Sequence, residues 1–288
     1  MQKKTTMLRE LLKRDKILMV PGAYDAVSAM AAAKSGFEAV YMTGNGAVTS
    51  LTGLPDISLA TGTEMVMKAA YMADAISVPL IADADTGYGN AVNVMRTVHQ
   101  FELAGVAAIH LEDQVVPKRC GHMPGKQVIP QDEMVGKIRA AIEARTDPDF
   151  MIIARVDSRA VNGFDDAIRR GKAYQGAGAD VIFLEALETK QEFEECAKAI
   201  DAPLLANMAE FGKSPYLSAQ ELEQMGYNIV IFPTTSFKVA LKAVLDFYSE
   251  LKQTGTQAGY LDRMLTRKQL YSLIDYDRFT EYKEKFGG

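Results

Sequence analysis

The sequence predicts an α/β protein with one large domain, a (β/α)8 TIM barrel. Eight short apolar runs alternate along the chain with eight amphipathic segments. The runs are apolar on both faces, as expected for parallel strands that helices cover on the outside. The length of 288 residues suits a single barrel. A doubly wound open sheet has the same local pattern but usually fewer strands, so the eight units favour the barrel.

The predicted strands follow in order at residues 17–20, 39–42, 79–82, 107–111, 151–154, 181–184, 204–206 and 229–232. The predicted helices have apolar residues three and four positions apart. They lie at residues 25–34, 64–75, 92–103, 131–144, 165–177, 190–200, 218–225 and 237–253. Gly36, Gly105, Gly178 and Gly226 follow helix ends, where glycine readily adopts the left-handed backbone. The barrel domain is therefore predicted to cover residues 1–253.

Residues 254–288 do not fit a ninth unit and are predicted to form a C-terminal helical extension. Short amphipathic helices are expected at residues 260–265 and 267–273, with Tyr, Leu and Met on one face. These helices could pack on their own barrel. They could instead pack on a neighbouring subunit, which would make the protein an oligomer.

The composition narrows the class of function. A net charge of −5 argues against a general nucleic-acid binder. The two cysteines, Cys120 and Cys196, do not suggest a disulfide framework, so a cytoplasmic protein is expected. The apolar run at residues 17–20 is far too short to cross a membrane. A small molecule is therefore the expected partner, with neither nucleic acid nor a membrane.

A cysteine surrounded by basic residues follows the fourth predicted strand. Cys120 has Lys118, Arg119 and His122 beside it in the sequence. A thiol among cations has a stabilised charged form and can be chemically active. TIM barrels carry their active sites at the carboxyl ends of the strands. The sequence therefore predicts a reactive thiol at the barrel mouth.

Carboxylates follow the strands at the same end of the predicted barrel. Asp83 and Asp85 end the third strand, and Glu112 ends the fourth. Asp56 lies in an earlier loop. A hard divalent cation such as Mg²⁺ takes one or two carboxylates and keeps waters or substrate oxygens. The alternative is a solvated acidic turn. A metal site is favoured because Asp56, Glu112 and Cys120 are expected at the same barrel mouth.

Groups that could bind an anion lie after other strands. Gly44, Asn45 and Gly46 form a glycine-rich turn whose backbone N–H groups could hold a carboxylate or phosphate. Arg155 could clamp a carboxylate with two hydrogen bonds, or pair with a neighbouring acid of the chain. Further polar groups facing the mouth are Glu185 and Asn207, while His110 is expected to support the site from behind.

Six motifs, in order along nearly the whole chain, resemble the isocitrate lyase and phosphoenolpyruvate mutase superfamily. They lie at residues 21–26, 53–56, 83–89, 112–114, 118–122 and 205–208. The resemblance implies a modified (β/α)8 barrel whose C-terminal helix is swapped between subunits, giving a homotetramer built as a dimer of dimers. It also implies Mg²⁺, with Mn²⁺ as a possible substitute, and a hydroxy di- or tricarboxylate substrate.

The resemblance also implies roles for particular residues. Asp83 and Asp85 would bind Mg²⁺ directly or through water, with Asp56 and Glu112 around them. The α-carboxylate and its oxygen would be held by Tyr41, Thr43, Gly44 and Asn45. The departing acid or the oxyanion would contact Arg155, Glu185 and Asn207. Cys120 would be the catalytic thiol, within a loop shaped by Lys118, Gly121 and His122.

The cysteine loop is the mark of the carbon–carbon lyase branch of that superfamily. The implied reaction cleaves a 2-hydroxy diacid, with (2R,3S)-2,3-dimethylmalate, giving propanoate and pyruvate, as the favoured substrate. Thr43-Gly44-Asn45 replaces Ser-Gly-Gly of methylisocitrate lyases, Val156 replaces Thr, and Met123 replaces Arg. These departures favour a substrate with fewer carboxylates. The alternatives are a 2-methylisocitrate lyase, a carboxyphosphonoenolpyruvate phosphonomutase and an oxaloacetate hydrolase.

Overall fold

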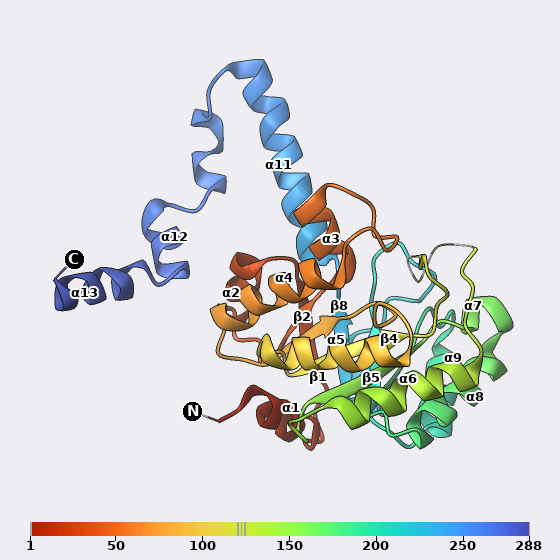
Figure 1. Cartoon of the computed structure of the whole chain (residues 1–288). Coiled ribbons are helices and arrows are strands. Elements are labelled where there is room, and N and C mark those ends of the chain that lie inside the picture. The colour runs from red at the N-terminus through yellow and green to blue at the C-terminus, as the bar shows by residue number, and fades with distance from the viewer. Residues whose placement is uncertain (1, 120, 122, 124, 288) are drawn as a thin grey trace.

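The computed structural model of the chain describes residues 2–119, 121, 123 and 125–287. Its centre is a closed barrel of parallel strands in sequence order (Figure 1). The strands are β1 (Leu18–Ala23), β2 (Val40–Met42), β3 (Leu80–Asp83), β4 (Ala108–Glu112), β5 (Met151–Val156), β6 (Val181–Leu184), β7 (Leu204–Asn207) and β8 (Ile229–Phe232). Because β1 pairs with β8, with Leu18 opposite Ile229, the sheet closes on itself. The predicted barrel is confirmed, and the open sheet is excluded.

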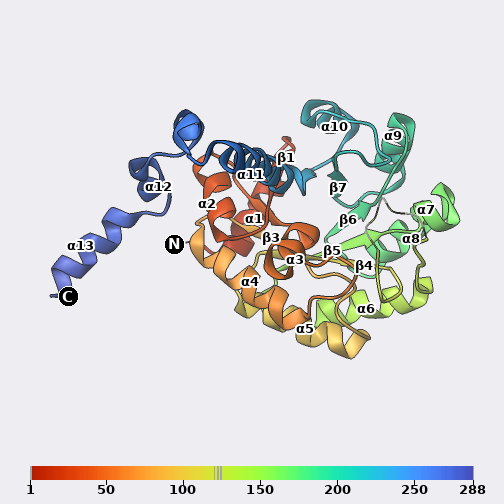
Figure 2. The same cartoon turned by 90° about the horizontal axis from the view of Figure 1, so that it is seen from above.

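The helices surround the strands, as Figure 2 shows from above. Each strand is followed by at least one helix before the next strand begins. The outer helices are α2 (Ala26–Lys34), α4 (Gly62–Ala75), α5 (Ala91–Leu103), α6 (Gln131–Ala144), α8 (Phe164–Gly176), α9 (Lys190–Ala199), α10 (Ala219–Met225) and α11 (Thr235–Thr254). All eight agree with predicted helices to within a few residues. Among the described residues, none of these helices, nor any other, is long and apolar enough to cross a bilayer.

Two buried clusters hold the barrel together. The larger cluster packs the outward side chains of the strands against the helices. The smaller cluster fills the barrel interior with inward side chains such as Val20, Ile81, Ile153 and Phe183. Burial of apolar side chains on both faces of the strands explains why the strands read as continuous apolar runs. The inner cluster forms the floor beneath the polar groups at the strand ends.

Several helices were not predicted. They are α1 (Lys4–Leu12), α3 (Gly44–Thr52), α7 (Arg159–Asn162) and α13 (Tyr276–Phe286). Helix α1 lies at the bottom of the barrel, opposite α3 (Figure 1), and inserts the fully buried Leu8 into the inner cluster. Helix α3 corrects the prediction of a glycine-rich turn at residues 44–46. Burial of Ala47 and Val48 stabilises that helix despite its glycines.

The C-terminal extension leaves the barrel after α11. It consists of η1 (Ala258–Arg263), a 3-10 helix, followed by α12 (Arg267–Leu273) and α13. Figures 1 and 2 show these elements extending to one side of the barrel. One anchor ties them to α2, because Lys34 Nζ donates to Asp275 Oδ1 at 2.6 Å. Large apolar side chains such as Leu265 and Phe279 are exposed along the extension.

Gly22 is predicted to be required for closure of the barrel. A Cβ atom at Gly22 would lie 1.9 Å from the carbonyl oxygen of Pro233, beside the β1–β8 pairing. Gly22→Ala should therefore lower the free energy of unfolding in urea by about 1–3 kcal/mol or more. Gly136→Ala is the matched control, because a Cβ there, within α6, meets no atom within 4 Å. That variant should be about 1 kcal/mol more stable, and equal behaviour of the two would refute the prediction.

Candidate active site at the barrel mouth

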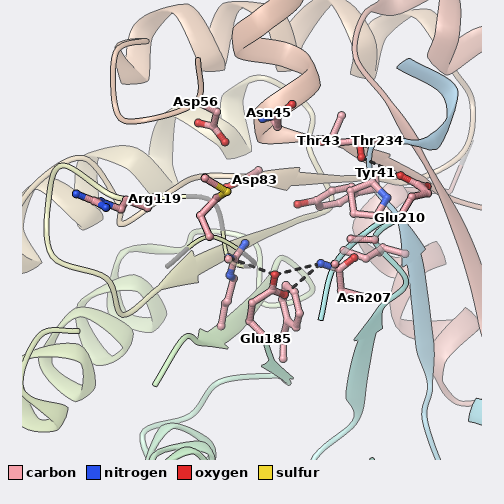
Figure 3. Close-up of a pocket in the computed structure, with 18 of the residues that line it drawn as sticks. Tyr41, Thr43, Asn45, Asp56, Asp83, Arg119, Glu185, Asn207, Glu210 and Thr234 are labelled. Atoms are coloured by element: carbon pink, nitrogen blue, oxygen red, sulfur yellow. Dashed lines mark hydrogen bonds and ion pairs between the residues drawn. The ribbon is translucent and has the colours of Figure 1, made fainter. Parts of the chain in front are cut away.

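The carboxyl ends of the strands converge on a cavity of about 270 Å³. Tyr41 comes from β2, Asp83 from β3, Arg155 from β5 and Asn207 from β7. Glu185 follows β6 directly and reaches the same cavity. Figure 3 shows Glu185 and Asn207 on one side of this space and Asn45 across from them, with Tyr41 beside Thr43. The predicted binding residues are therefore brought together at one place.

A buried lysine lies among the predicted metal-binding carboxylates. The Nζ atom of Lys118 is 2.6 Å from Asp56 Oδ2 and 2.9 Å from Asp85 Oδ1. Asp56, Asp83, Asp85 and Lys118 are all less than a tenth exposed. Removing such charges from water is costly unless opposite charges lie close to them. Lys118 is therefore the counter-charge in direct contact with Asp56 and Asp85 in the described part of the chain.

The carboxylates differ in how firmly they hold a proton. Burial, with repulsion from Asp83 and Asp56, raises the pKa of Asp85 to about 6 in spite of Lys118. Burial also acts to raise the pKa of Asp83, but His110, Lys118 and Arg155 hold it well below its usual value. Burial raises the pKa of Glu112 well above its ordinary range. Asp83 is thus the most firmly ionised of the three.

The cluster fits a magnesium-like ion that keeps part of its own oxygen shell. Among the described residues, Asp56 Oδ1 and Glu112 Oε1 are buried without a hydrogen-bond partner. Such atoms have unused capacity to accept water or to bind a cation. Within the same described residues, no three His, Cys, Asp or Glu side chains enclose a metal by themselves. Mg²⁺ does not require such a cage, since it usually retains several waters.

The glycine-rich segment after β2 is the amino terminus of a helix. Helix α3 begins at Gly44, with Thr43 as its N-cap residue. The first amide groups of a helix have no partner within it and favour anions. Gly44 is required there because a Cβ atom would lie 2.2 Å from Asp83 Oδ2. Although the predicted turn was wrong, a helix start offers the same kind of anion-binding backbone, and Asn45 lines the cavity beside it.

Arg155 is held from several sides. Its Nε and Nη2 atoms donate to Asp157 at 2.9 and 3.2 Å. Its Nη1 atom lies 3.4 Å from Glu112 Oε2, and its Nη2 atom lies 3.7 Å from Glu185 Oε1. The guanidinium also lies over the Phe183 ring, 5.3 Å from its centre. This buried cation therefore has a fixed orientation beside the cavity.

Two further predicted groups, Asn207 and Gly121, lie on the same side as Arg155. Asn207 Nδ2 donates to both oxygens of Glu185, at 3.3 and 3.1 Å (Figure 3). Gly121 lies so close that a Cβ atom would be 2.1 Å from Glu185 Oε1. Cys120 and His122, predicted as catalytic, lie outside the described residues. Their predicted roles stay predictions.

Other residues at the cavity were not singled out from the sequence. Phe183, Glu210 and Lys238 line it together with the predicted groups. Glu210 accepts hydrogen bonds from Thr234 and Lys238, at 3.1 and 3.0 Å. Phe183 belongs to an apolar strand and would be predicted as a core residue. Nothing in the sequence therefore indicates its contact with Arg155. Glu210 could have been found from its position shortly after the seventh strand.

Comparison with known proteins gives the family. The family model described as phosphoenolpyruvate phosphomutase matches residues 8–252, nearly the whole barrel. The chain belongs to this family. It is 50% identical to 2,3-dimethylmalate lyase of Eubacterium barkeri over 97% of the chain and 96% of that protein. It is 47% identical to 2-methylisocitrate lyase of Aeropyrum pernix, over 94% and 87% of the two chains. The predicted superfamily and the carbon–carbon lyase class are therefore confirmed.

Solved structures agree with this placement. A crystal structure of 2,3-dimethylmalate lyase, described as a PEP mutase/isocitrate lyase superfamily member, has a TM-score of 0.94 and 38% identity, covering 100% of this chain and 97% of that one. Oxaloacetate acetylhydrolase with 3,3-difluorooxalacetate has a TM-score of 0.95 and 36% identity, covering 99% and 98%. Phosphonopyruvate hydrolase with oxalate and Mg²⁺ has a TM-score of 0.90 and 29% identity, and each chain is fully covered. One fold thus supports several reactions in this family.

Tyr41 and His110 are predicted to stabilise the site as a pair. The Tyr41 hydroxyl lies 2.7 Å from His110 Nε2, and both side chains are buried. His110 Nε2 also lies 3.4 Å from Asp83 Oδ1, so His110 supports the acidic cluster from behind, as predicted. Tyr41→Phe removes only the hydroxyl and should lower the free energy of unfolding by about 1–3 kcal/mol. Unchanged stability in urea would show that the hydrogen bond contributes nothing.

Proposed function

We propose that the protein is a magnesium-dependent lyase that cleaves (2R,3S)-2,3-dimethylmalate to propanoate and pyruvate. The observation that carries the proposal is one cavity with two unlike walls. Buried Asp56 and Asp83, suited with Asp85 to a divalent cation, form one part of its lining, and the fixed cation Arg155 forms another. A 2-hydroxy diacid needs both a metal near its hydroxyl end and a cation for its far carboxylate. The 50% identity to 2,3-dimethylmalate lyase supports this choice.

We assign the divalent ion to the acidic cluster. Asp83 and Asp85 would hold Mg²⁺ directly or through water, with Asp56 and Glu112 around them, and Mn²⁺ is a possible substitute. The buried carboxyl oxygens that lack hydrogen bonds within the described residues support this assignment. The presence of Mg²⁺ in the phosphonopyruvate hydrolase complex supports it as well. When bound, the ion would act as a Lewis acid toward the 2-oxygen of the substrate.

The remaining residues would bind and orient the substrate. The start of α3, with Thr43, Gly44 and Asn45, would hold the 2-carboxylate through backbone and side-chain donors, with Tyr41 nearby. Arg155 would bind the carboxylate of the departing acid, while Glu185 and Asn207 fix its orientation. Fixing both ends of the substrate keeps the C2–C3 bond in one orientation, which lowers the entropic cost of reaching the transition state.

The proposed reaction is a retro-aldol type cleavage. The 2-hydroxyl loses its proton, the C2–C3 bond breaks, and C2 becomes the carbonyl carbon of pyruvate. The electron pair of the broken bond remains on C3, which then takes a proton and yields propanoate. We assign that proton to the Cys120 thiol, acting as general acid, with Lys118, Gly121 and His122 shaping the surrounding loop. Exclusion of water by the loop would prevent protonation from the wrong side.

2-Methylisocitrate is the second candidate substrate. A relative with that activity in its name is 47% identical to this chain. The choice depends on whether the cavity receives a methyl group or a third carboxylate at the far end. Met123 and Asn45 both line the cavity, and the apolar Met123 side chain favours the methyl group. Phosphonomutase or oxaloacetate hydrolase activity would require different chemistry at the same site.

We further propose that the extension at residues 254–288 packs on another subunit within a homotetramer. Helix α11 continues beyond the barrel with Leu245 and Tyr248 exposed, and the extension adds further exposed apolar side chains. Such a surface is costly to leave in water and is typical of an interface between subunits. Light scattering of the full chain after size exclusion should give a mass near four times 31.5 kDa. A monomer would contradict the proposal.

The substrate is tested with Mg²⁺ by release of pyruvate from 2,3-dimethylmalate, 2-methylisocitrate and citramalate, of glyoxylate from isocitrate, and of oxalate from oxaloacetate. The highest kcat/KM is expected for 2,3-dimethylmalate, because the cavity carries Met123 at its mouth. Preference for 2-methylisocitrate would change the assigned substrate but leave the assigned reaction, carbon–carbon bond cleavage, unchanged. Absence of cleavage of every hydroxy acid in the panel would contradict the proposed lyase reaction.

Two substitutions test the assigned roles. Cys120→Ser should keep the fold and Mg²⁺ binding but lower kcat by about 10²–10⁴-fold, the usual contribution of a general acid. Asp85→Ala should abolish both Mg²⁺ binding, measured by calorimetry, and pyruvate release. Cys196→Ser is the matched control for the thiol, because Cys196 is buried in α9, away from the cavity. Full activity of the Cys120 variant would exclude that thiol as proton donor.

A further inference from the structure

A second buried lysine comes from the segment between β4 and α6. This segment leaves the barrel at Asp113 and returns at Ile129, where Ile129 N donates to the Asp113 carbonyl at 2.9 Å. Val115 N donates to the Gln127 carbonyl at 2.9 Å, so the two ends run side by side as a stem. Lys126 belongs to the returning end of this stem, and its side chain is only 1% exposed.

Lys126 ends on the carboxylate that holds Arg155. Its Nζ atom donates to Asp157 Oδ1 at 2.8 Å. Arg155 Nη2 donates to the same oxygen at 3.2 Å, and Arg155 Nε donates to Asp157 Oδ2 at 2.9 Å. Asp157 is fully buried and therefore lies between two cations. Lys126 and Arg155 are therefore linked indirectly, because both donate hydrogen bonds to the Asp157 carboxylate.

The charges explain why two cations are present. Arg155 faces Asp157, Glu112 and Glu185, which are all buried carboxyl groups. If Arg155 were the only cation near these groups, Asp157 would neutralise most of the Arg155 charge. Asp157 would then compete with a substrate carboxylate for Arg155. Lys126 compensates Asp157 independently, because a buried ion requires its own partner. Arg155 therefore keeps charge available for Glu112, Glu185 and a ligand in the cavity.

Asp157 is also fixed from its backbone. Its N–H donates to Asp113 Oδ1 at 2.8 Å. The other oxygen of Asp113 accepts from Arg170 at 3.0 Å and from the Tyr174 hydroxyl at 2.8 Å. Since Asp113 and Asp157 are fully buried, this frame anchors Asp157 to α8. The side chain of Asp157 is then the adjustable part, and its orientation depends on Lys126 and Arg155.

We propose that Lys126 is a positioning residue that orients Arg155 toward the substrate carboxylate through Asp157. The proposal rests on the lyase function proposed above for its kinetic test. Lys126 itself has no contact with the cavity. Loss of a partner that orients a binding group typically lowers activity about 10- to 100-fold. A displacement of about 1 Å in a positioned group is enough for such an effect.

The first test is Lys126→Met, which keeps much of the length and removes the charge. With Mg²⁺ and the preferred substrate, kcat/KM should fall about 10- to 100-fold. Lys68→Met is the matched control, because Lys68 is also buried and its hydrogen bonds within the described residues go to the Ala47 carbonyl and the Ser50 hydroxyl, which carry no charge. Lys126→Met should unfold at a lower urea concentration than Lys68→Met, because buried Asp157 loses a counter-charge, so activity is compared under conditions in which both variants are folded. An equal loss of activity in the two would reduce Lys126 to a structural role and overturn the proposal.

The second test is a double-mutant cycle. If Lys126 acts through Asp157, Lys126→Met should have little further effect in an Asp157→Asn background. Lys126→Arg, which restores the charge, should recover at least part of the activity. Additive losses from the two substitutions, or no recovery with arginine, would exclude a route through Asp157.

A structural readout separates this proposal from the lyase proposal. In a crystal structure of the Lys126→Met protein, the Arg155 guanidinium should move away from Glu112 and Glu185 compared with the unsubstituted protein. That result would support the positioning role even if the substrate panel gave no pyruvate. An unmoved Arg155 would refute it, whatever the activity of the unsubstituted enzyme.

Discussion

The site depends on the compensation of buried charge at the mouth of the barrel. Asp56, Asp83 and Asp85 are buried close together, and Lys118 lies among them. A buried carboxylate without a counter-charge is expensive, so these groups cannot be considered one at a time. Replacing one member changes the proton affinity and the orientation of the others. The barrel wall and the inner cluster provide the rigid frame against which these charges are held.

Parallel strands explain why so many charged groups meet at one end. Several strands are largely apolar and carry a polar residue at or directly after their last position, as Asp83 does on β3 and Asn207 does on β7. In a closed barrel all these ends face the same opening. A sequence in which polar residues follow apolar runs therefore predicts a common site without any distance being known. The fold and some lining residues of the cavity, such as Asp83, Arg155 and Asn207, could be predicted on this basis.

Other features depend on tertiary contacts and could not be predicted. The glycines of α3 disfavour a helix, but burial of Ala47 and Val48 outweighs their low propensity. Lys126 and Asp157 are 31 positions apart, so nothing in the local pattern links them. The pairing of Lys118 with Asp56 spans 62 positions. Sequence patterns predict which residues reach the barrel mouth, whereas their partners are fixed only when the loops pack.

Both lysines that compensate the site come from one segment, residues 113–129. Lys118 compensates the acidic cluster, and Lys126 compensates Asp157 on the Arg155 side. A displacement of this segment would therefore remove a counter-charge from the acidic cluster and from Asp157 at once. By linkage, a cation bound at the acidic cluster would compete with the Lys118 ammonium for the same oxygens. The position of the segment and the charges bound in the cavity are thus energetically coupled, which gives a physical reason for two buried lysines within nine residues.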